Sequence, residues 1–115
     1  MPTVVMSLPI VAGETEAFQT AHRRFVVQRR PEFEASRLRL GVHSERGFLQ
    51  RTATGDLAIV ILEVEDPARM FAGVASSNEG LDADFRAYLR QVFGLDVTRP
   101  PPSAPAELVF DWRAP

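Results

Sequence analysis

The sequence predicts a single α+β domain over residues 1–115, with an antiparallel sheet that carries helices on one face. Short runs rich in valine and isoleucine predict strands, and apolar residues at i, i+3, i+4, i+7 and i+8 predict a helix after residue 82. These elements follow one another in the order β-α-β-β-α-β. A chain of 115 residues has the length of one domain.

The first half of the chain predicts one strand and two helical segments. Thr3–Ile10 is a short valine-rich run, which is typical of a buried strand. Gly13 is the expected N-cap of a helix that runs to about Arg30. Pro31 disfavours helical geometry in the residue before it and suits the start of a new turn. We therefore expect a kinked or second helix that ends at Gly41.

The second half predicts a hairpin, two helices and a final strand. Gly55 can supply the positive φ of the hairpin turn, and the aspartates expected to begin the two helices are Asp66 and Asp82. The expected elements are strands Ser44–Thr52 and Leu57–Glu65, a short helix from Pro67, a helix from Asp82 to Gly94, and a last strand Glu107–Trp112. This order is the ferredoxin-like arrangement, with a four-stranded antiparallel sheet.

Apolar residues occupy both faces of the expected strands. In the third strand Leu57, Ile59 and Ile61 point one way and Ala58, Val60, Leu62 and Val64 the other. A sheet with helices on one face should instead alternate apolar with polar residues. We therefore expect two sheets to pair face to face in a homodimer. The alternative is that a small domain exposes a few apolar side chains.

The composition excludes several classes of protein. The net charge is −2 with 13 basic and 15 acidic residues, so a nucleic-acid partner is not expected. There is no cysteine, which excludes disulfides and thiolate metal sites. No apolar run approaches the roughly 20 residues that span a bilayer, and the N-terminus lacks a signal-peptide pattern. We expect a cytoplasmic protein with no membrane contact.

The basic stretch AHRRFVVQRRPEF divides into two parts on a helical wheel. Arg23, Arg24 and Arg30 lie well away from the apolar face and should meet water. His22 and Arg29 lie within about 40° of Phe18, on or beside the face that meets the sheet. They could line a ligand cavity between helix and sheet. The alternative is a hydrogen-bonded boundary histidine and an arginine that extends to water.

Several stretches together resemble a known superfamily. These are LPIVAGETEAF, LGVHSERGFLQRTATGDLAIVILEVED, LDADFRAYLRQVFGLDV and the closing FDWR. They are similar to the dimeric α/β-barrel superfamily, which includes antibiotic-biosynthesis-monooxygenase-like proteins, and to a group of bacterial domains of unknown function within it. The resemblance implies two sheets paired face to face. It implies no single chemistry, since this fold hosts oxygenases, isomerases, haem enzymes and plain binders.

Some of these relatives oxidise aromatic molecules without a cofactor, which requires polar groups in an apolar pocket. The candidate ligand-binding residues here are His22, Arg29, Tyr88, Asp111 and Trp112. Tyr88 and Trp112 could equally be core residues whose polar tips reach a partner. No catalytic residue is identified, no metal-ligand pattern is present and no cofactor motif occurs. Some relatives bind haem through a histidine, and nothing in the sequence selects His22 or His43 for that role.

Two classes of function remain open at this point. The first is a dimer that binds or processes a small molecule, such as a cofactor-independent oxygenase or isomerase. The second is a non-catalytic dimerisation or accessory domain with a filled core. The first class predicts a cavity of about 300 Å³ or more between helices and sheet, reached by His22 or Asp111.

Overall fold

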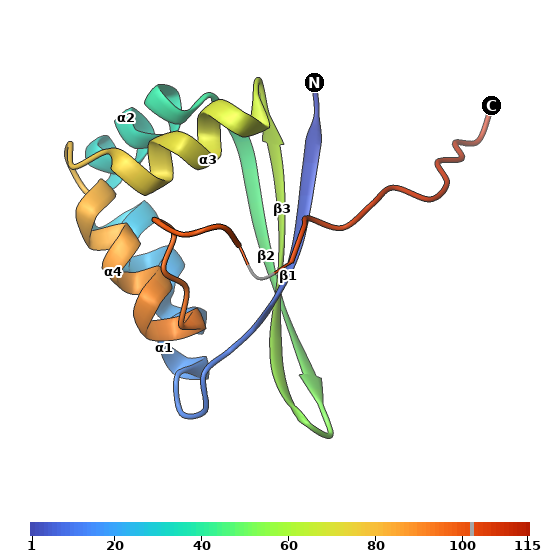
Figure 1. The fold of residues 1–115 in the computed structure, drawn as a ribbon, viewed down its shortest axis with the longest axis horizontal. Coiled ribbons are helices and arrows are strands. Elements are labelled where there is room, and N and C mark those ends of the chain that lie inside the picture. The colour runs from blue at the N-terminus through green and yellow to red at the C-terminus, as the bar shows by residue number, and fades with distance from the viewer. Residues whose placement is uncertain (102) are drawn as a thin grey trace.

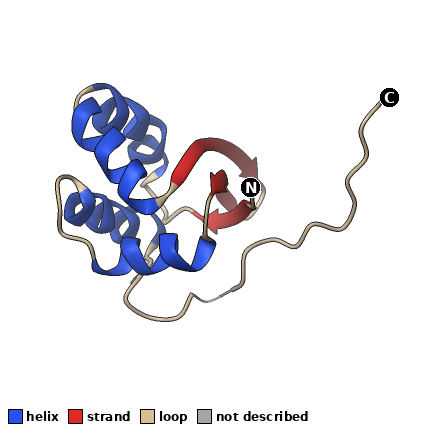
Figure 2. Ribbon diagram, turned by 90° about the horizontal axis from the view of Figure 1, so that it is seen from above, coloured by secondary structure: helices blue, strands red, loops and turns tan. Residues whose placement is uncertain are grey.

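The computed structural model describes residues 1–101 and 103–115 of the chain (Figure 1). Its elements in chain order are β1 (Thr3–Pro9), α1 (Thr15–Ala21), the π-helix η1 (His22–Val27), α2 (Arg30–Leu40), β2 (Val42–Thr52), β3 (Gly55–Val64), α3 (Pro67–Ser76) and α4 (Asp82–Phe93). The sheet is antiparallel with the order β1-β3-β2. All the helices lie on one face of it (Figures 1 and 2). The predicted α+β class and one-sided helix layer are confirmed.

The prediction of a fourth strand is wrong. Within the described residues the sheet has three strands, and the expected strand Glu107–Trp112 pairs with none of them. One backbone hydrogen bond precedes it, in which the Ala106 amide donates to the Val5 carbonyl at 2.7 Å. Beyond that contact the chain runs out from the body (Figure 1). Alternating apolar residues make a segment suitable for a strand, but a strand also needs a neighbour to pair with.

The helical segment after β1 breaks at two places. The predicted single helix to Arg30 is instead α1 followed by the wider turns of η1, and α2 begins at Arg30. Glu14, not Gly13, is the N-cap of α1. Pro31 lies in the first turn of α2, as expected, and the helix ends at Gly41, which adopts a left-handed φ of 70°. This bent path wraps the helices around one side of the sheet.

The register of the strands places each side chain on the expected face. Val4, Met6 and Leu8 of β1 lie opposite Leu62, Val60 and Ala58 of β3, and all of them belong to the cores on the helix side of the sheet or border them. Leu57, Ile59 and Ile61 point to the opposite face, which no helix covers (Figure 2). Phe48 lies opposite Ile59 and is 46% exposed. The two-faced apolar pattern is therefore confirmed, while the pairing of two sheets stays a prediction.

Two buried clusters fill the space between helices and sheet. One gathers around Phe25 and Tyr88, and the other around Leu40 and Met70. Met6 and Val60 pack against the second cluster but are only half buried, because they also line the space between helices and sheet.

The two aspartates expected to cap helices behave differently. Asp66 caps α3, because its carboxylate accepts from the amides of Ala68 and Arg69. Asp82 does not cap α4, since the N-cap is Leu81 and the Asp82 side chain turns to the neighbouring helices. None of the described helices combines the length and apolar character needed to cross a membrane.

Candidate functional site

A cleft of about 2020 Å³ lies between the helix layer and the sheet. Its volume exceeds the roughly 300 to 1,000 Å³ of a typical small-molecule pocket because it is an open groove and not an enclosed cavity. The sheet contributes inward-facing side chains of all three strands, and the helices contribute aromatic rings. The main apolar lining residues are Met6, Leu8, Phe18, Leu49, Val60 and Phe85.

The cleft opens along the edge of the sheet formed by β2. Glu45 and Gly47 lie opposite Leu62 and Val60, so they belong to the helix-facing side, yet both are exposed. A side chain at Gly47 would stand 3.5 Å from the ring of Phe18. Glycine at this position therefore lets Phe18 of α1 pack directly over the backbone of β2.

Five aromatic rings form a continuous wall on the helix side. Phe25 makes edge contacts with Phe85 and Tyr88, at centroid distances of 5.5 Å and 5.4 Å. Tyr88 continues to Phe93 at 6.0 Å, and Phe93 to Phe18 at 5.9 Å. Edge-to-face contacts of this kind fix the rings relative to one another. The wall is thus a rigid apolar surface built from α1, η1 and α4.

A buried ion pair stands next to this wall. Arg37 on α2 is 8% exposed, and its Nε lies 3.0 Å from Oε1 of Glu45 on β2. The guanidinium lies over the rings of Phe33 and Phe85, at 4.4 Å and 4.5 Å from their centroids. Aromatic faces attract a cation, and the carboxylate neutralises its charge. Arg37 and Glu45 therefore place paired charges beside the aromatic wall of the cleft.

The hydroxyl of Tyr88 adds a neutral hydrogen-bonding group. Tyr88 is 5% exposed and lines the cleft. Burial raises the pKa of its phenol to about 12, and the negative charge of Glu45 acts in the same direction against the opposing effect of Arg24. The phenol therefore stays protonated across the neutral range and can donate a hydrogen bond.

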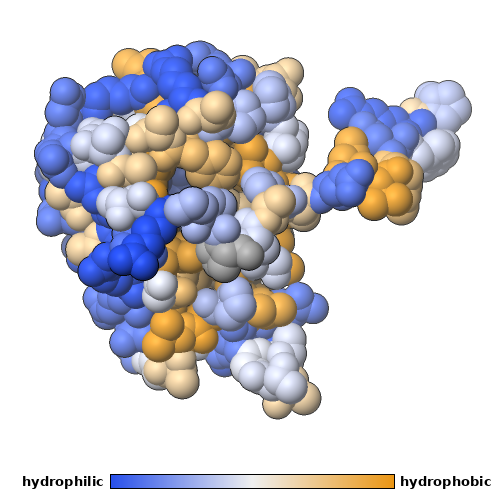
Figure 3. All heavy atoms as spheres, viewed as in Figure 1, coloured by the Kyte–Doolittle hydropathy of each residue, from blue (hydrophilic) through white to orange (hydrophobic). Residues whose placement is uncertain are grey.

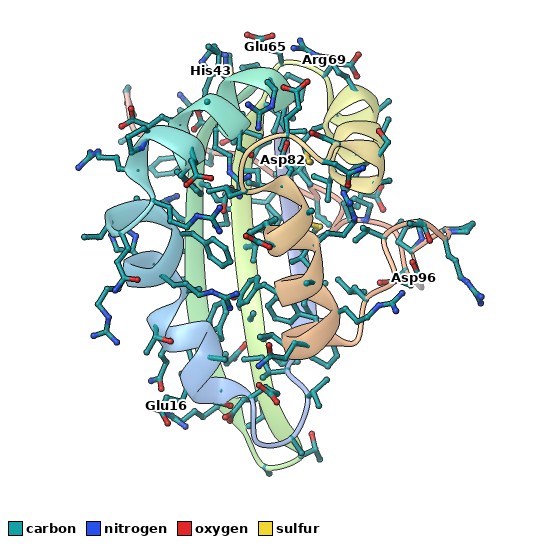
Figure 4. All side chains as sticks on the ribbon, turned by 90° about the vertical axis from the view of Figure 1, so that its left-hand side faces the viewer. Glu16, His43, Glu65, Arg69, Asp82 and Asp96 are labelled. Carbon is teal, nitrogen blue, oxygen red and sulfur yellow. The ribbon has the colours of Figure 1, made fainter. Side chains whose placement is uncertain are left out.

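A second polar cluster ties the helices together behind the cleft. The Asp82 carboxylate accepts from Ser36 and, at 2.6 Å, from the Ser77 hydroxyl, and it pairs with Arg39 at 3.0 Å. Burial raises the pKa of Asp82, but the hydrogen bonds from Ser36, Ser77 and Arg39 together hold it below its ordinary value. Figure 4 shows Asp82 at the start of α4, among the helices. This cluster anchors α2, the helix that carries Arg37, to α4.

The structure places the five predicted site residues in three different settings. His22 and Tyr88 line the cleft, His22 from its exposed rim. Arg29 bridges two carboxylates, at 2.6 Å from Asp84 and 2.7 Å from Glu32, and the hydrogen bond to Arg29 lowers the pKa of Glu32. Asp111 and Trp112 lie on the exposed C-terminal segment (Figure 1). Ligand binding by these five residues stays a prediction.

The other histidine lies at one end of the cleft. His43 Nε2 is 2.8 Å from Glu65 Oε1, and Arg69 lies 3.3 Å from the other oxygen of the same carboxylate. Figure 4 shows the three side chains gathered at one end of the molecule. The hydrogen bond to His43 is the largest cause that lowers the pKa of Glu65, and the charge of Arg69 acts in the same direction against the opposing effect of burial. No group of three or more potential metal ligands occurs within residues 1–101 and 103–115.

Glu45 and Arg37 were not among the predicted site residues, although the sequence contains a pattern that indicates each of them. Glu45 shares its strand face with Leu49, four residues on, so period two alone puts a carboxylate on the inner face. Arg37 follows Phe33 by one helical turn, which is the spacing of side chains that touch. An inner-face acid and a helical arginine beside a phenylalanine together indicate a buried pair.

Comparisons with known proteins found no relative of this chain. The chain matches no protein-family model, no curated protein and no solved structure. Its function is therefore inferred from the cleft itself.

Proposed function

We propose that the protein binds a small, largely apolar molecule with one polar end in the cleft between its helices and its sheet. The observation that carries this proposal is an open cleft of about 2020 Å³ with aromatic rings on one wall and a small set of polar groups. Pockets of this composition are the usual sites of small-molecule binding. Its location agrees with the helix–sheet cavity expected from the sequence, and His22 lies on its rim.

The polar groups suggest how such a ligand would be oriented. Arg37 and Glu45 stand together near the mouth, and the protonated hydroxyl of Tyr88 lies on the aromatic wall. An apolar body would pack on the rings while its polar end accepts from Tyr88 or pairs with the exposed side of Arg37 and Glu45. The same arrangement suits the substrate of a cofactor-independent oxygenase or isomerase, two of the activities found in the dimeric α/β-barrel superfamily that the sequence resembles.

Neighbouring residues on β3 provide a matched test. Val60 faces the cleft and Ile61 faces the uncovered side of the sheet. We expect the fluorescent probe 8-anilinonaphthalene-1-sulfonate to bind the protein, and Val60→Trp to weaken that binding about tenfold by placing a bulky ring against the aromatic wall. Ile61→Trp should leave the affinity within about twofold. Circular dichroism confirms that both variants are folded.

A separate variant tests the hydrogen bond that Tyr88 would donate to the polar end of the ligand. Tyr88→Phe removes one hydroxyl and should weaken binding of the probe about threefold to tenfold, the range of one hydrogen bond. Absence of saturable probe binding to the folded protein would contradict the proposal, as would equal losses in the Val60 and Ile61 variants.

A second candidate function is favoured by the uncovered apolar face of the sheet. Ile59, Ile61 and Phe48 lie there without a helix above them, which suits a dimerisation or accessory domain. In that case the folded protein would self-associate without binding the probe in its cleft.

A further inference from the structure

The last described part of the chain carries large apolar side chains that are mostly exposed. We name residues 107–112 the arm. Leu108, Val109, Phe110 and Trp112 are between 76% and 86% exposed. Figure 3 shows hydrophobic side chains gathered on this segment, clear of the rest of the molecule. Side chains of this size are normally buried, so the arm lacks its packing partner.

The sheet has an open edge where such a segment can pair. β1 is paired on one side only, with β3. The carbonyl of Pro2 and the amide of Ile10 bond toward β3, so the backbone groups of Thr3, Val5 and Ser7 point to the open side. Within the described residues, Val5 alone has a backbone partner there, the amide of Ala106.

The register of that contact prevents the arm from completing its own sheet. Ala106 donates to Val5, so in an antiparallel ladder Leu108 would lie opposite Thr3, the first residue of β1. Val109 to Trp112 would then extend past the strand. The apolar residues from Val109 to Trp112 would therefore have no strand of their own chain to pair with. Figure 1 shows the segment leaving the sheet.

We propose that the arm of one chain forms a fourth strand on the open β1 edge of a second copy, and that the exchange is reciprocal. A second copy presents both halves of the contact, an arm without a strand and an edge on which, among the described residues, Val5 alone has a backbone partner. Two such contacts related by a twofold axis close into a dimer. Addition of an extended segment to an exposed edge is an established mode of recognition. The apolar outer face, with Val5 and Ile61, lies beside the same edge.

Two single variants disable the two halves separately. Phe110→Asp places a charge on the arm, with Arg113→Ala as its control at the exposed end of the chain. Ser7→Pro removes an amide that points to the open edge, and proline is tolerated on edge strands, where Pro9 already stands in β1. Ser7→Ala is its control. Proline at Ser7 removes no bond to β3, so the variant should remain folded.

We expect the unaltered protein to sediment at twice 12.8 kDa at micromolar concentration. Phe110→Asp and Ser7→Pro should each weaken the dimer at least about tenfold, while Arg113→Ala and Ser7→Ala should sediment as the unaltered protein does. A mixture of the two defective variants should restore dimers, because one intact arm meets one intact edge.

Three results would overturn the proposal. They are a monomeric unaltered protein, a dimer that survives Phe110→Asp, and a mixture that gives no heterodimer. A sheet-face dimer without arm exchange would appear as the second result. Probe binding in the cleft is measured separately, so Phe110→Asp can abolish the dimer while the cleft keeps its affinity.

Discussion

Nε of Arg37 lies 3.0 Å from Oε1 of Glu45, and this pair joins helix α2 to strand β2 across the cleft. Arg37 is almost fully buried, whereas 28% of the Glu45 side chain is exposed. The pair therefore combines a costly buried cation with a carboxylate at the cleft mouth. Removal of this pair should therefore change both the packing of the helices and the polarity of the cleft.

We expect Glu45→Gln to lower the free energy of unfolding by roughly 3 kcal/mol, because it leaves the Arg37 charge buried without a carboxylate. Arg37→Met with Glu45→Leu should recover much of that loss, since no charge then remains in the interior. The matched control is Arg30→Ala, which breaks an exposed pair with Glu34 and should cost less than about 1 kcal/mol. Urea unfolding monitored by circular dichroism measures all three. Equal losses for Glu45→Gln and Arg30→Ala would contradict the buried pair.

Tyr88 is the one tyrosine of the chain, so its ionisation can be followed directly by ultraviolet absorbance. Burial, assisted by the charge of Glu45, raises its pKa to about 12. We expect the absorbance midpoint near that value, and Glu45→Gln should move it down. Because the pKa of Tyr88 is raised in the folded state, the protonated phenol stabilises the fold. This stabilisation is complete below the pKa of tyrosine in the unfolded chain, about 10, and is lost as the pH rises through the folded pKa. A midpoint near 10 in the folded protein would contradict the burial of the hydroxyl.

Asp82 makes stability depend on pH at the acid end. Its pKa is lowered by hydrogen bonds from Ser36, Ser77 and Arg39 that outweigh its burial. A lowered folded pKa stabilises above the unfolded value, and that stabilisation disappears as the pH falls through the folded pKa. Asp82→Asn should cost about 2 kcal/mol at neutral pH and flatten the decline between about pH 5 and pH 2.

Urea unfolding at a series of pH values measures this effect. Asp84→Asn is the control, since that side chain is 60% exposed on the same helix. If the stability of Asp82→Asn falls as steeply at acid pH as that of the unaltered protein, the pH dependence comes from other carboxylates.

Asp66 is the helix cap that the sequence identified correctly. Its carboxylate accepts from the amide of Ala68 at 3.0 Å and from that of Arg69 at 3.4 Å. Asp66→Ala should cost about 1 kcal/mol, and Asp66→Ser should retain most of the stability because serine also caps. Thermal unfolding at neutral pH compares the three proteins. A serine variant no better than alanine would show that the capping bonds contribute little.

Local patterns predicted the strands and their faces well. The alternation in β3 placed Val60 and Ile61 on opposite sides because the period of a strand is fixed at two residues. Gly41 ended its helix as expected, because the end of a helix often requires a left-handed residue. These features depend on neighbours in the sequence, so the sequence alone was sufficient.

Features that depend on distant partners were predicted less well. Phe110 and Trp112 alternate as strand residues do, yet strand formation depends on a neighbour that their own sheet does not provide in register. Asp82 has the position of a cap, but Ser36, far away in the sequence, competes for its carboxylate. Arg29 bonds to Asp84 of another helix, and the helical wheel of a single helix cannot show such a partner. Pairing and side-chain competition are set by tertiary structure.

The two edges of the sheet differ in a way that bears on kinetics. The cleft opens beside Glu45 and Gly47 on β2, while the unpaired backbone of β1 lies on the far side of β3. A molecule that enters beside Glu45 need not cross the edge of β1 that would hold a second chain. Uptake and release should then proceed at rates that do not change with protein concentration, because no subunit has to leave before the ligand can.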